Sequence, residues 1–195
     1  MKSYWVDSLT GGDSHALFVE HFRLRKRVFI DGLNWRLNTR DDQEFDQYDT
    51  PFASYCLVSD NDRLVAGARI LPTNIEVGPN TYMIRDAALG RLGSGLPPTI
   101  CEGFAPPVCP NIWEATRLIV DPTLPKETKK EALRITIDRL VAEARKAGVE
   151  KLLAIGGVEL ALGVKISGHA IERLTPYHST ESGGIAIFQM PIFHL

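Results

Sequence analysis

The chain has 195 residues, of which 44% are hydrophobic and 24% charged, and its formal net charge at pH 7 is −2. This length suits one domain with a large buried core, so we expect a single domain over residues 1–195. The balance of 22 basic and 24 acidic residues argues against a nucleic-acid-binding protein. We also expect no membrane span and no signal peptide, since no apolar run is long enough. Three cysteines without a CxxC pair favour a reduced, cytoplasmic setting.

The first half of the chain predicts a helix, a polar loop and a hairpin. Apolar residues at helical spacing indicate a helix over residues 14–30, capped by Asp13 or Ser14. A loop rich in Asp, Asn and Arg follows. Apolar runs over 52–59 and 64–71, joined by a polar turn, predict two paired strands.

The second half predicts alternating helices and strands. The expected elements, in order, are a short helix over 83–92, a Pro- and Gly-rich loop over 93–111, a strand over 113–120, an amphipathic helix from Pro125 to Gly148, a strand over 151–155, a helical turn over 158–162 and a strand over 185–192. The strand–helix–strand unit should be parallel. The fold class is therefore α/β (α+β), with a mixed twisted sheet flanked by helices.

Three carboxylates alternate with aromatic residues in the segment Glu44-Phe45-Asp46-Gln47-Tyr48-Asp49. The aromatic residues indicate that the segment packs against the body of the protein. Buried carboxylates need cationic partners. The candidates are Arg25, Arg69 and Arg117, and the last two interrupt otherwise apolar strands. Two interpretations stay open: a structural ion-pair network, or a polar active site in which one carboxylate acts as a base.

An ordered set of short motifs resembles the acyl-homoserine-lactone synthases, the autoinducer synthase family, over roughly residues 20 to 150. The motifs are Arg25-xxx-Phe29, Trp35, Glu44-x-Asp46-xx-Asp49, Arg69-Ile-Leu-Pro-Thr73 and Trp113-Glu114-Ala-Thr-Arg117. Ala87-Ala88 stands where the family has a Phe, and Thr116 stands where it has a Ser. The resemblance implies a fold similar to the N-acetyltransferases.

The resemblance also implies a reaction, the synthesis of a quorum-sensing signal. S-adenosylmethionine and an acyl thioester on acyl carrier protein would give N-acyl-homoserine lactone and methylthioadenosine, with no cofactor and no metal. It suggests Glu44, Asp46 and Glu114 as catalytic residues. The substrate-binding residues would be Arg25, Phe29, Trp35, Asp49, Arg69, Thr116 and Arg117.

Their chemistry suggests a task for some of these residues. Glu44 would accept the proton of the substrate amine, directly or through a water molecule. Asp49 and Arg69 would pair, and Trp35 would offer an aromatic face to the adenine or the sulfonium. Gly156 and Gly157 would leave room for an acyl chain.

A basic cluster opens the predicted long helix, with Lys126, Lys129 and Lys130 followed by Arg134. The preceding turn has no glycine, unlike the turns that bind the pyrophosphate of acetyl-CoA. The cluster therefore suggests a docking patch for an acidic carrier protein, and the alternative is an ordinary solvated helix start. Two other functions stay open: an N-acyltransferase that forms no lactone, and a non-catalytic binding module.

Overall fold

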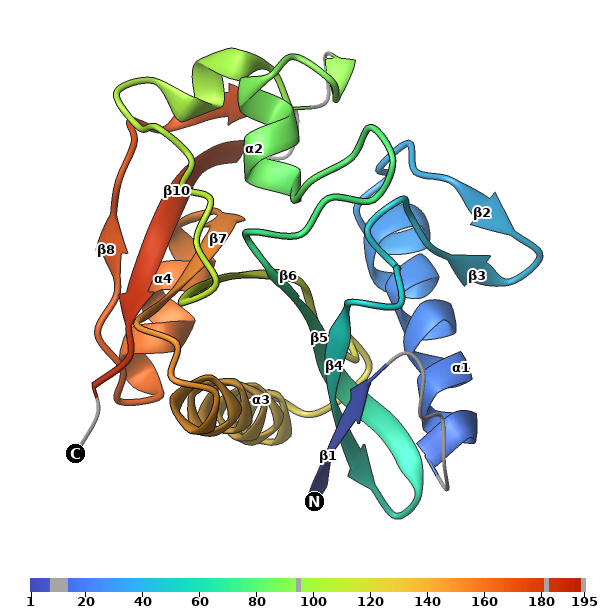
Figure 1. Ribbon diagram of the computed structural model, residues 1–195. Helices are drawn as coiled ribbons and strands as arrows, with labels where there is room; N and C mark the ends of the chain where they lie inside the picture. Colours follow the sequence, from blue (N-terminus) through green and yellow to red (C-terminus); the bar gives the residue numbers. More distant parts are fainter. Residues whose placement is uncertain (8–13, 94–95, 181–182, 194–195) are drawn as a thin grey trace. The chain divides into compact units, whose positions relative to one another are not determined.

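The computed structural model describes residues 1–7, 14–93, 96–180 and 183–193 (Figure 1). The helices are α1 (His15–Arg25), the π-helix η2 (Lys26–Gly32), α2 (Met83–Ala88), the 3-10 helix η4 (Pro98–Cys101), α3 (Lys126–Lys146) and α4 (Val158–Ile166). The strands are β1 (Lys2–Asp7), β2 (Thr39–Arg40), β3 (Gln43–Glu44), β4 (Ser54–Asp60), β5 (Arg63–Pro72), β6 (Ile112–Val120), β7 (Lys151–Gly156), β8 (Glu172–Arg173), β9 (His178–Thr180) and β10 (Gly183–Pro191).

The contacts within the chain group it into two units. The first comprises Met1–Ile70 and Arg117–Leu140, and the second comprises Leu71–Thr116 and Val141–Leu195. The strands β5 and β6 and the helix α3 therefore contribute residues to both. That the chain is one domain stays a prediction.

The first unit is built on antiparallel strands. Its hydrogen-bonding order is β1-β4-β5-β6, and β1–β4 and β4–β5 are antiparallel. Asn61 and Asp62, both with positive φ (47° and 63°), form the tight turn between β4 and β5. Two such residues match the right-handed twist of a hairpin. The predicted pair of strands over 52–59 and 64–71 is confirmed.

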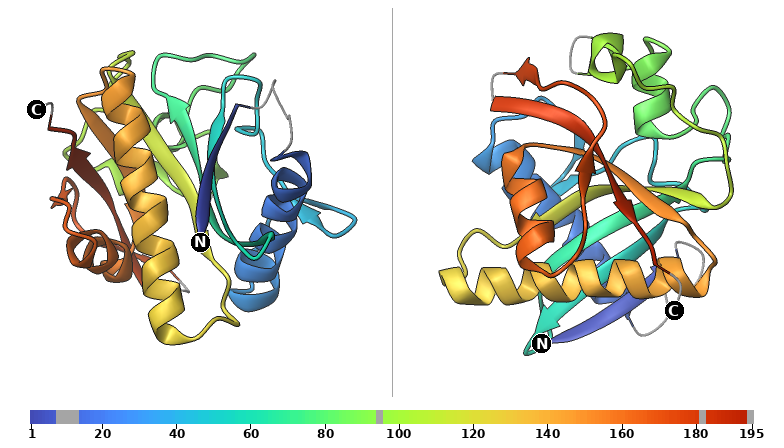
Figure 2. Two further views of the ribbon diagram at one scale, coloured as in Figure 1. Left: turned by 90° about the horizontal axis from the view of Figure 1, so that it is seen from below. Right: turned by 90° about the vertical axis from the view of Figure 1, so that its left-hand side faces the viewer.

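Helices α1 and α3 cover opposite faces of this sheet (Figure 1, Figure 2). On one face, the ring of Tyr55 on β4 lies 4.9 Å from the ring of Phe18 on α1. On the other, Cys56 Sγ lies 3.8 Å from the Thr136 carbonyl oxygen on α3. Successive side chains of a strand point to opposite faces, so these two neighbours place one helix on each side.

In the second unit the hydrogen-bonding order is β6-β7-β10-β8, with β9 paired to β10. β6 and β7 run parallel, with Glu114 opposite Leu153, and β7 and β10 run antiparallel. The predicted parallel strand–helix–strand unit is thus confirmed. Gly148 ends α3 with φ +72°, as its position predicted. The fold class predicted from the sequence, a mixed sheet flanked by helices, is also confirmed.

Several elements differ from their sequence prediction. The helix predicted over 14–30 continues to Gly32, and its last seven residues form the π-helix η2. Ser14 occupies the N-cap position but makes no side-chain cap hydrogen bond, and Asp13 lies outside the described residues. β1, β2, β3, β8 and β9 were not predicted. In β1 only Val6 is buried, so its sequence lacks the alternation that would reveal it.

Candidate active site

The acidic segment leaves β3 in a turn held by its own side chains. Glu44 ends β3, and the side chain of Asp49 accepts the backbone N–H of Asp46 (2.8 Å). The side chain of Asp46 in turn accepts the backbone N–H of Tyr48 (2.9 Å). Asp side chains form such turns readily. The turn thereby fixes the carboxylates of Asp46 and Asp49 relative to each other.

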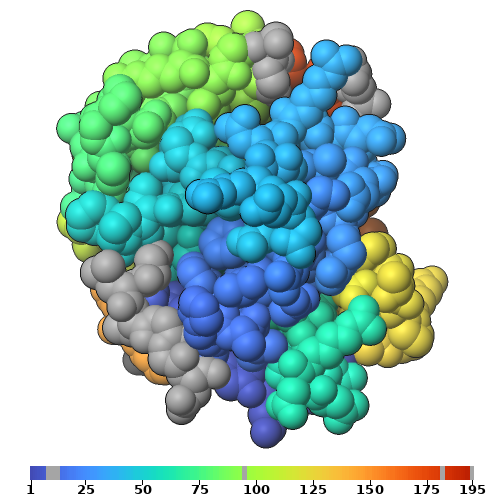
Figure 3. All heavy atoms as spheres, turned by 90° about the vertical axis from the view of Figure 1, so that its right-hand side faces the viewer, coloured from blue at the N-terminus to red at the C-terminus, as the bar shows by residue number. Residues whose placement is uncertain are grey.

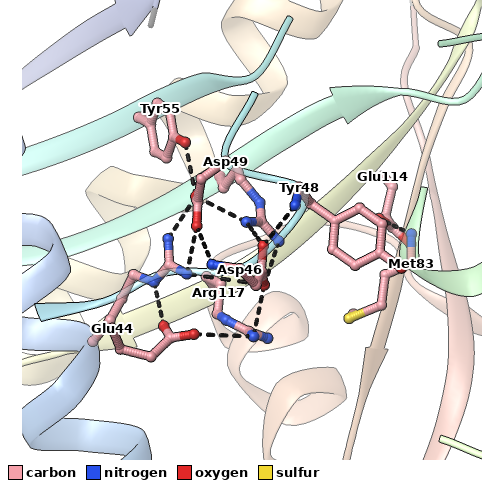
Figure 4. Close-up of polar contacts among 10 residues, drawn as sticks. Glu44, Asp46, Tyr48, Asp49, Tyr55, Met83, Glu114 and Arg117 are labelled. Carbon is pink, nitrogen blue, oxygen red and sulfur yellow. Dashed lines mark hydrogen bonds and ion pairs between the residues drawn. The ribbon is translucent and has the colours of Figure 1, made fainter. Parts of the chain in front are cut away.

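Three arginines from three elements meet these carboxylates (Figure 4). Arg25 on α1 donates to Glu44 (2.6 Å) and to both oxygens of Asp49 (2.7 and 2.9 Å). Arg69 on β5 donates to Asp46 (2.5 Å) and Asp49 (2.8 Å). Arg117 on β6 forms an ion pair with Asp46 (2.7 Å) and donates to Glu44 (3.2 Å). We call these six side chains the ion-pair cluster. The predicted pairing of Asp49 with Arg69 is confirmed.

The cluster is buried and balanced in charge. The side chains of Arg25, Arg69 and Glu44 are 0% exposed, and those of Asp46, Asp49 and Arg117 are at most 9% exposed. Burying an unpaired charge costs several kcal/mol, so each member depends on the others. The expected burial of the acidic segment and its arginine partners is confirmed. A structural ion-pair network and a polar active site would both contain these contacts, so the contacts alone do not distinguish the two interpretations.

The arginines keep two carboxyl groups ionised. Burial acts to raise the pKa of Asp46, but the guanidinium groups of Arg69 and Arg117 outweigh it and lower that pKa. The pKa of Asp49 is lowered in the same way, against burial, by Arg69 and Arg25. Burial and the neighbouring Asp49 raise the pKa of Tyr55, whose hydroxyl donates to that carboxylate (2.8 Å). Asp46 and Asp49 are therefore ionised at neutral pH, each paired with arginine.

Arg117 also caps a stack of two aromatic rings. Its guanidinium carbon lies 5.4 Å from the ring centroid of Phe29, and Phe29 stacks on Trp35 at 5.0 Å and 11°. Trp35 is 36% exposed. The backbone of Arg117 has φ +53° within β6, a left-handed conformation that costs a non-glycine residue roughly 1–2 kcal/mol. Such strain is typical of functional positions.

A cavity of about 340 Å³ opens beside the cluster, between α1, β3 and β4. Its lining comprises Phe18, Phe22, Gln43, Phe45, Asp46, Asp49, Thr50, Pro51 and Tyr55. Figure 3 shows the face of the molecule that α1 and the β2–β3 hairpin form. Asp46 and Asp49 thus belong to the ion-pair cluster and also line the cavity.

Glu114, the third predicted catalytic residue, lies in the second unit and holds the start of α2. Its side chain is 1% exposed. One oxygen accepts the backbone N–H of Met83 (3.0 Å) and the other that of Ile84 (2.8 Å). A carboxylate suits the first N–H groups of a helix, which have no partner within it. Thr116 is buried two residues further along β6.

The predicted docking patch lies on the first three turns of α3. Lys126, Lys130 and Arg134 are exposed, and Lys129 is half-buried. Lys130 pairs with Glu127 and Arg134 with Asp138, both at 2.8 Å. Acidic side chains therefore offset part of the positive charge of the patch.

Two features near the predicted site residues were missed or misjudged. His21 on α1 is 0% exposed, and neither ring nitrogen has a hydrogen-bond partner among the described residues. Nothing in the sequence distinguished it from the other helix residues. The space above Gly156 and Gly157 is not open, since a Cβ there would lie 2.5 Å from Leu160 Cδ2 and 2.6 Å from Glu159 Oε2.

Within the described ranges, no group of three or more His, Cys, Asp or Glu side chains is placed to hold a metal ion. In the same part of the chain, no helix combines the length and the apolar character needed to cross a bilayer.

Comparison with known proteins agrees with the fold. The solved structure of BjaI, a CoA-dependent acyl-homoserine lactone synthase with SAM and isopentyl-CoA, matches with a TM-score of 0.78 at 19% identity, over 98% of this chain and 83% of that one. A Lactobacillus plantarum protein assigned as an N-acetyltransferase matches with a TM-score of 0.59 at 11% identity, over 98% of each chain. These likenesses show the fold alone, which this chain shares with both proteins.

The sequence comparisons go further. The family model of the autoinducer synthases matches residues 12–193. An acyl-homoserine-lactone synthase of Pseudomonas chlororaphis is 33% identical over 159 residues, which cover 79% of this chain and 69% of the relative. This chain belongs to the autoinducer synthase family and is an enzyme of that family.

Proposed function

We propose that this enzyme joins the amino group of S-adenosylmethionine to an acyl chain carried by acyl carrier protein, and closes the product to an N-acyl-L-homoserine lactone. The observation that carries the proposal is the contact among six residues of the family motifs in the buried ion-pair cluster. These contacts fit a structural network as well, and the match to the autoinducer synthase family is what favours an active site. Family membership and the fold it shares with BjaI support the same conclusion.

Two bond changes make the product. First the methionyl amine forms a bond to the thioester carbonyl carbon, the C–S bond breaks, and the carrier thiol leaves. Then a carboxylate oxygen of the same methionyl group attacks its γ-carbon, and the C–S bond of the sulfonium breaks to release methylthioadenosine. The attacking amine must first lose a proton, and we assign its acceptance to Glu44, acting directly or through a water molecule.

The two carboxylates of the cluster that also line the cavity, Asp46 and Asp49, suit a substrate that carries two positive groups. The ammonium and the sulfonium are cationic, and Asp46 and Asp49 stay ionised because arginines lower their pKa values. Fixed charges in a site with little water stabilise a bound cation more than the same charges do in water. The half-exposed face of Trp35, backed by Phe29, suits the adenine ring.

For the acyl donor we favour acyl carrier protein over CoA. The support is the exposed basic patch of Lys126, Lys130 and Arg134 on α3, which complements an acidic carrier. The turn before α3 also lacks the glycine residues that cradle a pyrophosphate. BjaI is CoA-dependent, so CoA is the competing donor that an assay must include. The described cysteines are free thiols, which suits our proposal of a cytoplasmic enzyme.

The test is a reconstituted assay with the purified chain, S-adenosylmethionine, and matched acyl groups on carrier protein or on CoA. Methylthioadenosine and lactone should form in equal amounts, with the higher kcat/KM for the carrier-bound donor. Amide product without methylthioadenosine would instead identify an N-acyltransferase of another kind. Binding without turnover of either donor would identify a non-catalytic module. A higher kcat/KM for acyl-CoA would reverse the choice of donor alone.

A further inference from the structure

His21 is seated directly on a glycine of the neighbouring strand. A Cβ added to Gly67 on β5 would lie 2.7 Å from His21 Nδ1, 3.0 Å from the backbone carbonyl oxygen of Cys56 on β4, and 3.1 Å from His21 Cε1. The imidazole ring also contacts the rings of Tyr55 (5.5 Å) and Phe22 (5.7 Å). The absent side chain of Gly67 thus creates the space that the ring fills.

This contact is the first of two that join α1 to the sheet. His21 and Arg25 are four residues apart on α1, so they lie on the same face of the helix. Gly67 and Arg69 are two residues apart on β5, so they lie on the same face of the sheet. The first contact is between His21 and Gly67, and the second joins Arg25 to Arg69 through the carboxylate of Asp49, which both arginines bind. The distance between α1 and β5 at His21 therefore sets the distance between them at Arg25.

The ring performs this role without directional bonds and without charge. Both nitrogens of His21 lack a hydrogen-bond partner among the described residues, so packing alone sets its position. The charged groups around it are Arg25 on its own helix, Asp49 on the loop, Arg69 on β5 and Arg117 on β6. A protonated ring would add a fourth positive charge to a cluster of three arginines and three carboxylates.

We propose that His21 is a positioning residue of the active site: its imidazole, seated on Gly67, spaces α1 from the sheet so that the Arg25 guanidinium reaches Glu44 and Asp49 together. Arg25 bonds these two carboxylates at 2.6 to 2.9 Å, and a small shift of α1 would break at least one bond. The proposal rests on the proposed function in so far as turnover is its readout.

The experiment is a double-mutant cycle of Gly67→Ala and His21→Ala, read as kcat for methylthioadenosine release and as the thermal midpoint. Gly67→Ala should lower kcat by about ten- to a hundredfold, because displacements near 1 Å have effects of that size. His21→Ala should lower it less, since it opens a gap without a clash. The double variant should recover part of the loss caused by Gly67→Ala, because the new methyl group then meets no ring and only its 3.0 Å approach to the Cys56 carbonyl oxygen remains.

Two matched controls exclude general damage. His15 on α1 is exposed, and a Cβ on Gly184 would meet its nearest atom at 3.5 Å, an ordinary contact. His15→Ala and Gly184→Ala should therefore keep the wild-type kcat. Wild-type kcat in Gly67→Ala would overturn the proposal. Should Gly67→Ala fail to fold, His21→Ala decides, and a lowered thermal midpoint with unchanged kcat in that variant would also overturn it.

A readout that does not need turnover separates this proposal from the proposed function. The NMR signal of the Arg25 Nε–H, which donates to Glu44, reports the position of the guanidinium. It should shift in His21→Ala and stay unchanged in His15→Ala. If the wild type releases no methylthioadenosine, the proposed function fails, and this signal alone still decides on His21.

Discussion

Arg25 holds Asp49 with both terminal nitrogens of its guanidinium, Nη1 to Oδ1 at 2.7 Å and Nη2 to Oδ2 at 2.9 Å. The two residues lie 24 positions apart, and the pair fastens the loop after β3 to helix α1. Its third nitrogen, Nε, donates to Glu44 at 2.6 Å. Every side-chain nitrogen of this buried arginine is thus engaged with a carboxylate of the cluster.

Arg25→Lys should therefore lower kcat/KM on the order of a hundredfold, although the charge is kept. A lysine is a point charge and cannot reproduce the planar, two-point bond to Asp49. The measurement is steady-state release of methylthioadenosine. Arg23→Lys is the control, because Arg23 pairs with Glu20 and Asp42 on the exposed side of α1 and should keep wild-type activity. Equal rates in both variants would contradict the role of Arg25.

His21 should make the fold sensitive to mild acid. Burial, followed by Arg25, lowers its pKa well below the usual 6.5, so the unfolded chain binds a proton that the folded chain resists. Stability should then decline as pH falls below about 6.5, by roughly 1.4 kcal/mol per pH unit, and is fully present above that value. His21→Leu, which does not titrate, should lack this slope in urea unfolding between pH 7 and pH 5.

The carboxylates of the cluster affect the stability of the fold in a different pH range. The pKa values of Asp46 and Asp49 are lowered below their usual 3.8, so the stability they contribute is lost only as pH falls below that value. The two effects can therefore be measured separately. Parallel pH curves for the wild type and His21→Leu would show that His21 does not titrate differently in the folded state.

Glu114→Gln should weaken the start of α2. An amide has one oxygen, so it can accept from Met83 or Ile84 in the present geometry but not from both. The loss of one such bond costs about 1–2 kcal/mol, or a few degrees in the thermal midpoint. Activity that falls much further than this stability would support the catalytic role proposed for Glu114. The exposed substitution Glu127→Gln is the control and should leave the midpoint unchanged.

Charge reversal of Lys129 and Lys130 should raise KM for acyl carrier protein several-fold and leave KM for S-adenosylmethionine unchanged. The expected effect grows at low ionic strength, because the attraction acts between exposed charges. Reversal of Lys165, which is exposed on α4, serves as the matched control. An unchanged KM for the carrier in the double reversal would remove the patch from the docking surface.

The core of the site could be predicted because buried charges leave a clear trace in the sequence. Arg69 and Arg117 interrupt strands that are otherwise apolar, and only a nearby carboxylate could compensate them. The aromatic residues of the acidic segment indicated that it supplies those carboxylates. The contacts of Arg69 with Asp46 and of Arg117 with Glu44 confirm that argument.

Other parts of the site depend on contacts that leave no such trace. Glu114 caps a helix that begins 31 residues before it, and the spacing along the chain gives no sign of this. The seat of His21 on Gly67 joins an ordinary helix residue to an ordinary strand glycine. The positive φ of Arg117 is likewise a property of the assembled sheet, because arginine has no preference for that conformation.

The most direct test of the account is mass spectrometry of lipid extracts from cells that express either the wild-type chain or Glu44→Gln. Because Glu44 is fully buried and bonded to Arg25 and Arg117, the substitution keeps its shape and removes its charge. The account predicts N-acyl-homoserine lactone from the wild type and none from Glu44→Gln, with both proteins folded. Lactone from both chains in equal amounts, or from neither, would contradict it.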